Sequence, residues 1–510
     1  MIEKLLSLIL LMTINVESKL RNLNPNEIQE LKNAINEASE IMEIEAKNEN
    51  VIICIGSPRS GKSTLINYLI GNKLIGVRDF KNNAISIVKA DNSPGPEIGS
   101  GSTSKTTLPS RWSSINFPGL SLWDAPGFDD NRGPIQDITN AIYIYQLLQK
   151  VQSLKILLVI DINDILHDNI KPFLTVLNAV DNLFKDELNY YFRSISVIFS
   201  KVYTFHDVPI DMEFINDLLR EKILSTTNMS ISENLREFVR FLVLNNQHIG
   251  FFKKAKLGPI TNEIDINIFQ AIQNSKSTEK TILTKISPSI SDESMLYLYE
   301  ARESLSSTSS FIKLQEIVEQ TLNYHSNRVQ IIDKNNNDSL NNLQIIYNDL
   351  YNIKLKIHKT FNVSLDFHQK IEILQSIDPE IKSHIEKENL FEKAKFLEII
   401  DKLLKLKESN IFDINLQSIL NLSLIKLSES MISISLELGK ITQGKSEELL
   451  ENERIRHYYE REKLNTYLLD IQKLNEERKK YLYDTFGNFL KMAVTKVASW
   501  FLTRGASSLS

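Results

Sequence analysis

Residues 51–64 read VIICIGSPRSGKST, and the predicted fold class follows from them. Val51–Ile55 is a short apolar run rich in β-branched residues, which predicts a buried strand. The pattern GxxxxGK[ST] follows at once in Gly56–Ser63, and Leu65–Ile70 then predicts a short helix that Gly71 stops. A strand, a glycine-rich loop and a helix in this order predict a loop whose backbone N–H groups surround phosphate oxygens.

The side chains of this loop have separate expected roles. Lys62 is expected to place its ammonium at the β- and γ-phosphates, and the Ser63 hydroxyl to reach Mg²⁺. Cys54 is expected to be a small buried apolar residue of the strand. The full set expected to contact a nucleotide is Gly56, Ser57, Pro58, Arg59, Ser60, Gly61, Lys62, Ser63, Thr64, Gly127, Ser200 and Lys201.

A second motif supports the first. Leu120–Trp123 alternates like a strand and ends in Asp124-Ala125-Pro126-Gly127. An acidic residue at the carboxyl end of a neighbouring strand can hold the Mg²⁺ shell, and the Gly127 N–H can contact a γ-phosphate. The alternative is a strand that ends in an ordinary Pro-Gly turn.

A small, polar, glycine-rich stretch, Gly99–Pro109, lies between the two motifs. A threonine in such a loop can coordinate Mg²⁺ through its hydroxyl and contact the γ-phosphate through its amide, which orders the loop only with a triphosphate. We favour Thr106 for this role, with Thr107 and Thr103 as alternates. The competing interpretation is a plain flexible loop.

These motifs together resemble a GTPase of the P-loop class, over about 200 residues. DAPG is similar to the DxPG of dynamin-like, septin-like and Toc or immunity-associated GTPases. Thr106–Pro109 resembles the T-x-x-P of dynamin-type switch loops. Arg59 resembles the loop arginine of guanylate-binding proteins and atlastins, where it acts as an internal finger. The resemblance thus implies four catalytic candidates, namely Lys62, Thr106, Arg59 and Gly127, and three magnesium ligands, Ser63, Thr106 and Asp124.

Two positions depart from that pattern. Phe128 stands where Ras-like enzymes carry a water-orienting glutamine, so backbone, Thr106 or a partner must position the attacking water. Ser200-Lys201-Val202-Tyr203 is similar to the base-reading N/T-K-x-D, with tyrosine in place of the guanine-reading aspartate. Asp207 is a possible substitute from the loop. Guanine specificity therefore rests on the resemblance.

The glycine distribution predicts the domain organisation. Ten of the 16 glycines lie between Gly56 and Gly133, and none occurs between Gly258 and Gly439. Turns need such residues, so the later region reads as helices. We expect an N-terminal helical segment over 1–48, a nucleotide-binding domain over 49–258 and an elongated all-α domain over 259–510. Ile249–Phe252 is expected to be the last strand of the nucleotide-binding domain.

Composition limits the remaining possibilities. A net charge of −5 argues against nucleic-acid binding, and one cysteine fits the reducing cytoplasm. The sequence contains no run of 18 or more apolar residues, so a conventional membrane-spanning helix is not expected.

The apolar patch Leu5–Val16 is either a packed helix or a signal-like, membrane-inserting segment. Glu448–Leu482 carries a narrow seam typical of a coiled-coil contact or an antiparallel stalk, and the wide apolar face over 486–501 either docks on a membrane surface or closes the helical core.

The sequence therefore predicts an α/β P-loop NTPase domain, with a mostly parallel sheet and helices on both faces, followed by a helical stalk. The predicted activity is Mg²⁺-dependent GTP hydrolysis coupled to helix rearrangement or self-assembly, including a homodimer. The alternatives are an ATPase of the same class, a nucleotide-binding scaffold with little hydrolysis, and a coiled-coil protein with a vestigial site.

Overall fold

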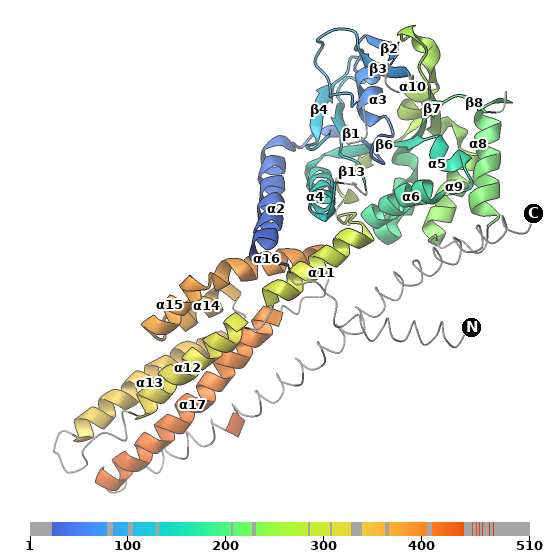
Figure 1. Cartoon of the computed structure of the whole chain (residues 1–510). Coiled ribbons are helices and arrows are strands. Elements are labelled where there is room, and N and C mark those ends of the chain that lie inside the picture. The colour runs from blue at the N-terminus through green and yellow to red at the C-terminus, as the bar shows by residue number, and fades with distance from the viewer. Residues whose placement is uncertain are drawn as a thin grey trace, which may run out of the picture. The chain divides into compact units, whose positions relative to one another are not determined.

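The computed structural model describes residues 23–78, 85–99, 106–128, 132–205, 208–226, 231–283, 286–306, 309–327, 339–362, 367–404 and 411–442, with seven isolated positions beyond. The chain divides into two compact units. We call Asn24–Tyr297 the α/β unit, and the described residues of the other unit from Leu298 onward the helical unit; Leu23 also belongs to that second unit (Figure 1).

A mixed sheet with a parallel centre forms the core of the α/β unit. The strands lie in the order β12-β10-β7-β6-β1-β5-β4, and β13 pairs with the start of β6. The five central strands are parallel, whereas β4, β12 and β13 pair antiparallel. Their bounds are β1 Asn50–Gly56, β4 Ser110–Ser113, β5 Ser121–Asp124, β6 Ser153–Asp161, β7 Ile195–Val202, β10 Ile249–Lys253, β12 Asp265–Ile266 and β13 Thr278–Glu279.

Helices cover both faces of this sheet, as predicted (Figure 1). One face packs on α3 and α10 through a cluster that includes Ile52, Leu65 and Ile268. The other face carries α4, α6 and α9. Alternation along each strand sends successive side chains to opposite faces, and burial on both sides explains the nearly continuous apolar runs. The helices are α3 Lys62–Leu69, α4 Pro134–Lys150, α5 Asn163–Leu166, α6 Lys171–Phe184, α7 Leu188–Tyr191, α8 Met212–Leu219, α9 Glu233–Leu244 and α10 Ile268–Asn274.

A second, three-stranded sheet stands beside the first. It consists of β2 Leu74–Arg78, β3 Ile85–Lys89 and β11 Gly258–Pro259, in the antiparallel order β11-β2-β3. A two-stranded pair, β8 Thr204–Phe205 and β9 Val208–Pro209, follows β7.

The two compact units divide the chain at other positions than the predicted domains. Helix α2, Pro25–Glu45, belongs to the α/β unit and packs on α4, where Gln146 donates a hydrogen bond to Ser39. The unit also extends beyond residue 258 to Tyr297, because β12, α10 and β13 complete its sheet and one face. Short edge strands bounded by polar residues need no glycine, so the glycine count placed this boundary too early.

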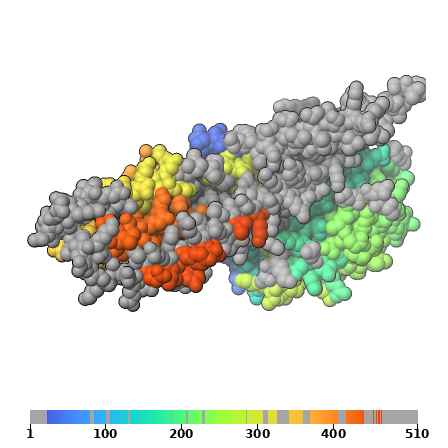
Figure 2. All heavy atoms as spheres, turned by 90° about the horizontal axis from the view of Figure 1, so that it is seen from below, coloured from blue at the N-terminus to red at the C-terminus, as the bar shows by residue number. Residues whose placement is uncertain are grey.

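The helical unit confirms the predicted helix-rich region. Its helices pack around one cluster of buried leucine and isoleucine side chains, with α12 and α13 lying against α17. Figure 2 shows α17, in orange to red, beside the yellow α12. The bounds are α11 Asp292–Ser306, in which the unit boundary falls, α12 Ser309–Asn327, α13 Ser339–Asn362, α14 Phe367–Gln375, α15 Pro379–Lys387, α16 Leu390–Leu403 and α17 Ile411–Thr442.

Within α17, the segment Leu416–Leu438 is long and apolar enough to cross a membrane by length and composition alone. However, 67% of its apolar window is buried inside the protein, as in core helices of water-soluble folds. This helix also buries polar groups, and Ser428 accepts a hydrogen bond from the fully buried Lys354 at 2.6 Å. Interior packing therefore accounts for the composition of α17 without a bilayer.

Three predictions fall outside the described residues. They concern the N-terminal patch Leu5–Val16, the C-terminal face over 486–501, and the seam over 448–482, of which only isolated positions are described.

Candidate nucleotide-binding site

The predicted phosphate loop lies where β1 ends and α3 begins, at the carboxyl edge of the parallel strands. Strand β1 lies between β5 and β6 in the sheet. The loop therefore lies where later strands of the chain are placed on opposite sides of β1, which is a usual position for ligand sites in such sheets. Gly56 has a φ of 153°, and a Cβ there would lie 2.1 Å from the carbonyl oxygen of Val159. Only glycine fits at that position, because β6 approaches the backbone directly.

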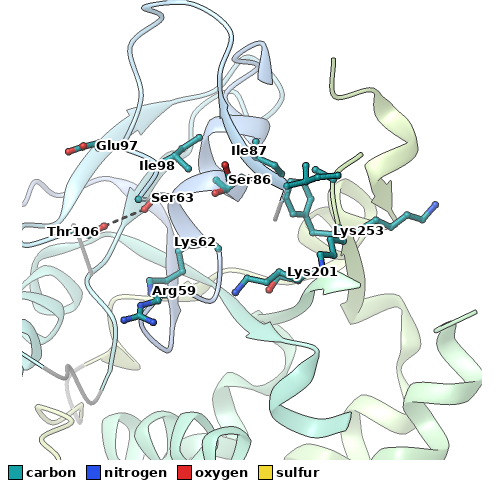
Figure 3. A pocket seen from close by; sticks show the side chains of 18 residues that line it. Arg59, Lys62, Ser63, Ser86, Ile87, Glu97, Ile98, Thr106, Lys201 and Lys253 are labelled. Atoms are coloured by element: carbon teal, nitrogen blue, oxygen red, sulfur yellow. Dashed lines mark hydrogen bonds between the residues drawn. The ribbon is translucent and has the colours of Figure 1, made fainter. Parts of the chain in front are cut away.

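Lys62 begins α3 and is folded back into the loop. Its Nζ donates hydrogen bonds to the carbonyl oxygens of Ser57 at 2.8 Å and Gly56 at 3.2 Å. The side chain is buried, yet it lines the pocket beside the loop (Figure 3). The loop backbone thus holds a positive charge where phosphate oxygens are expected.

The three predicted magnesium ligands meet at one point. The Ser63 hydroxyl donates to Asp124 Oδ2 at 2.7 Å, and the Thr106 hydroxyl approaches the same oxygen at 3.4 Å. The two hydroxyl oxygens are 3.3 Å apart. Thr106 is therefore the candidate threonine that lies beside Ser63 and Asp124, and the alternate Thr103 lies outside the described residues.

Asp124 has the properties of a cation ligand. The side chain is fully buried, and its second oxygen, Oδ1, has no hydrogen-bond partner among the described residues. Burial raises the pKa of this carboxyl, against the opposing effects of the Ser63 hydrogen bond and the Lys62 charge. Hydroxyl and carboxylate oxygens are the donors Mg²⁺ prefers, so the residues present fit that ion.

A pocket of about 320 Å³ opens beside this cluster (Figure 3). That volume is at the lower end of the range for small-molecule sites, about 300–1,000 Å³. The predicted residues that line it are Arg59, Gly61, Lys62, Ser63, Thr64, Thr106, Ser200 and Lys201. The other predicted contacts, Gly56, Ser57, Pro58, Ser60 and Gly127, belong to the loop or pack on it, and a Cβ on Gly127 would lie 2.6 Å from the Pro58 nitrogen.

The two predicted base-end residues are held by the protein itself. The Ser200 hydroxyl donates to the Ser60 carbonyl at 2.6 Å, which fastens β7 to the phosphate loop. Lys201 forms an ion pair with Asp161 at 2.6 Å. Ser200 thus supports the loop as well as lining the pocket, and the Lys201 side chain is oriented before any ligand binds.

Tyr203, in the position of the missing aspartate, faces other protein groups. Its hydroxyl donates to Asn163 Oδ1 at 3.1 Å, and Lys254 Nζ lies 5.8 Å from its ring centroid. Asp207, the possible substitute, lies outside the described residues.

Several pocket residues were not predicted from motifs. Ile85, Ser86 and Ile87 come from β3, and Glu97 and Ile98 from the segment after it. No local pattern marked them, because only the tertiary packing of the second sheet brings β3 over the pocket. Phe252, Lys253, Lys254 and Ala255 form another wall, at the end of the last strand that the sequence predicted.

A pH dependence of stability arises at Asp164, which interacts electrostatically with the Asp161–Lys201 ion pair. Burial, followed by the charge of Asp161, raises the pKa of Asp164 from 3.8 to about 6. The folded state therefore holds the proton more tightly, and this stabilisation is complete below pH 3.8 and is lost as the pH rises through 6. Asp164→Asn removes the burial penalty of the charge, so it should stabilise the unit by about 1–2 kcal/mol at pH 8, allowing for partial exposure.

Urea unfolding at pH 4 and pH 8, monitored by tryptophan fluorescence, checks the predicted stabilisation, since the buried Trp123 reports on the sheet. Wild type and Asp164→Asn should differ at pH 8 and converge at pH 4, whereas Asp168→Asn, at an exposed neighbour, should match wild type at both. A difference independent of pH would contradict the assignment.

The fold and the site define a P-loop nucleotide-binding domain. Within the chain, residues 51–186 match the family described as 50S ribosome-binding GTPase. This match covers the phosphate loop and Asp124–Gly127, and it supports a P-loop GTPase domain. It ends before Ser200 and Lys201. No curated protein matches the chain.

Proposed function

We propose that this protein binds GTP with Mg²⁺ and hydrolyses its β–γ phosphoanhydride. The convergence of Ser63, Thr106 and Asp124 beside the phosphate loop carries this proposal. Loop amides and Lys62 hold the phosphates, and the three oxygen ligands hold the ion. Bound magnesium neutralises charge on the β- and γ-phosphate oxygens.

Guanine is the base that we propose. Guanine is supported by the family match, and adenine is the alternative because Tyr203 replaces the base-reading aspartate. Identification of the nucleotide that co-purifies with the native protein, together with competition between GTP and ATP for a fluorescent analogue, tests the choice. Displacement by ATP at the same concentration as GTP would favour the ATPase.

We further propose that nucleotide state is coupled to the helical unit or to self-assembly. Two contacts of α4 support this idea. Asn140 Nδ2 lies 3.4 Å from the Gly127 carbonyl, and the buried Asp137 carboxylate accepts a hydrogen bond from the Ser291 N–H, next to α11. One helix therefore links the DAPG motif to the helix in which the unit boundary falls.

The alternative of a scaffold with little hydrolysis is motivated by Phe128, which is buried and cannot orient water. Turnover measured over a range of protein concentrations distinguishes the two. A rate per molecule that rises with concentration would support an assembly-dependent enzyme, including a homodimer, and no turnover at any concentration would favour the scaffold. A cytoplasmic location and peripheral membrane contact remain predictions from sequence.

Arg59 is proposed to supply transition-state charge from within the loop. It is exposed, has a positive φ of 62° and lines the pocket. Arg59→Ala should lower kcat about 100-fold or more while nucleotide affinity changes less than about threefold. Single-turnover hydrolysis with affinity measured separately checks this. Unchanged turnover would show that the arginine only lines the pocket.

A further inference from the structure

The segment that follows β3 is fastened to α3 by two asparagine side chains. Asn67 is fully buried, and its Nδ2 donates one hydrogen bond to the Ser63 carbonyl and another to the Pro96 carbonyl, both at 2.8 Å. The Asn67 Oδ1 accepts a hydrogen bond from Asn72 Nδ2 at 2.7 Å. Asn72 Nδ2 also donates to the Pro94 carbonyl at 2.9 Å. We call these two amides, with Pro94–Pro96, the Asn67 clasp.

The clasp is closely packed. A Cβ on Gly95 would lie 2.2 Å from Asn67 Oδ1 and 2.5 Å from Asn72 Nδ2, so glycine allows the segment to lie directly on the two amides. The prolines on either side restrict the backbone torsions of the segment. From the other side, Lys89 Nζ donates to the Ser93 carbonyl at 2.9 Å. The backbone is therefore held from two directions just before the pocket.

The position of the clasp relates it to the site. Immediately after Pro96, residues 97–99 line the pocket, and Thr106 approaches Ser63 and Asp124 further along the chain. Figure 3 shows Ile98, Ser63 and Thr106 on the same side of the pocket. The Asn67 amide thus joins the backbone of one proposed magnesium ligand, Ser63, to the segment that leads to another, Thr106.

We propose that Asn67 is a positioning residue for the triphosphate-bound state, an inference that rests on the proposed GTP function. The clasp shortens the connection that must place Thr106 at the metal. Nine residues separate Pro96 from Thr106, whereas sixteen separate the end of β3 at Lys89 from it. Loop-closure entropy alone makes the shorter connection favourable by about twofold. The loss of two buried donor hydrogen bonds raises the expected effect to about tenfold.

The test compares triphosphate with diphosphate binding, because only the triphosphate is expected to engage Thr106. Asn67→Asp keeps the oxygen that accepts from Asn72, removes both donors and places an oxygen against two carbonyls. With Mg²⁺, affinity for a fluorescent non-hydrolysable GTP analogue should fall about tenfold, and affinity for fluorescent GDP should change less than about twofold. Asn72→Ala, which leaves the Pro96 bond intact, should cost the analogue about threefold.

Asn116→Ala is the matched control. Its Nδ2 also donates to a carbonyl of α3, that of Leu69 at 3.2 Å, but away from this segment, so neither affinity should change. Equal losses of GDP and analogue binding in Asn67→Asp would overturn the proposal, since a general weakening of α3 would explain them. Unchanged analogue binding would overturn it as well.

If Asn67→Asp does not fold, Gly95→Ala provides the second test, because the added Cβ pushes Pro94–Pro96 away from the Asn67 and Asn72 amides without changing a residue of α3. It should reproduce the selective loss of analogue binding. Absence of binding of both nucleotides to the wild-type protein would instead refute the proposed function, an outcome distinct from those above.

Discussion

Lys62→Ala is expected to lower the affinity for GTP and for GDP at least about 100-fold and to abolish turnover. Two loop carbonyls hold the ammonium at the mouth of the phosphate loop, so the ligand meets a positive charge already in position. Charge-assisted hydrogen bonds to phosphate are each worth about 1.5–3 kcal/mol, and one or two of them account for a loss of this size. Titration with fluorescent nucleotides, followed by a phosphate-release assay, measures both effects.

Lys155→Ala provides the matched control. Lys155 is a half-buried lysine of β6 whose Nζ donates to the Ile272 carbonyl at 2.9 Å, on the face covered by α10. Lys155→Ala also removes a lysine of the α/β unit that donates to a backbone carbonyl, and nucleotide affinity should stay within about twofold of the wild-type value. If Lys62→Ala retained wild-type affinity, the loop would not be the phosphate site, and the enzyme interpretation would fail.

Asp124→Asn is expected to have opposite effects on function and stability. It keeps an oxygen able to accept from Ser63 but removes the carboxylate charge, so magnesium should no longer strengthen GTP binding, a loss of about 100-fold in that enhancement. Burial raises the pKa of this carboxyl, which means that its ionised form is unfavourable in the folded protein without a cation. The variant without ligand should therefore unfold at a higher temperature than wild type at pH 7.

Nucleotide titrations with Mg²⁺ and with EDTA, and thermal unfolding without ligand, separate the two effects. Wild-type and variant affinities should coincide in EDTA and diverge only when magnesium is present. A variant that lost affinity equally in both conditions would indicate a distorted loop, and the assignment of Asp124 as a metal ligand would be withdrawn.

Local patterns predicted the central strands well. The runs at Val51–Ile55 and Leu120–Trp123 correspond to β1 and β5, and Ile249–Phe252 corresponds to β10. These strands are buried on both faces, so each needs an uninterrupted apolar run that is visible in isolation. The edge strands β12 and β13 have two residues each and carry no such pattern, which is why the end of the α/β unit was placed too early.

The same contrast holds for the site. The phosphate loop could be predicted from sequence because its glycines, lysine and serine are adjacent and their spacing follows from phosphate geometry. The preference for Thr106 among three threonines rested on resemblance, and its approach to Asp124 is visible only in the folded chain. Asn67 carries no motif signal of its own in our prediction, because its partner in the segment after β3, Pro96, lies 29 residues away along the chain.

By itself, the amino-acid sequence indicated the class of ligand site and the positions of several central strands along the chain, since both depend on short-range patterns of glycine, charge and apolar residues. Tertiary structure alone decided which residues from distant segments enclose the pocket. These include β3 and the segment after it. The physical reason is that wall contacts depend on how the second sheet and the long connections pack on the core, and such packing has no local periodicity to reveal it.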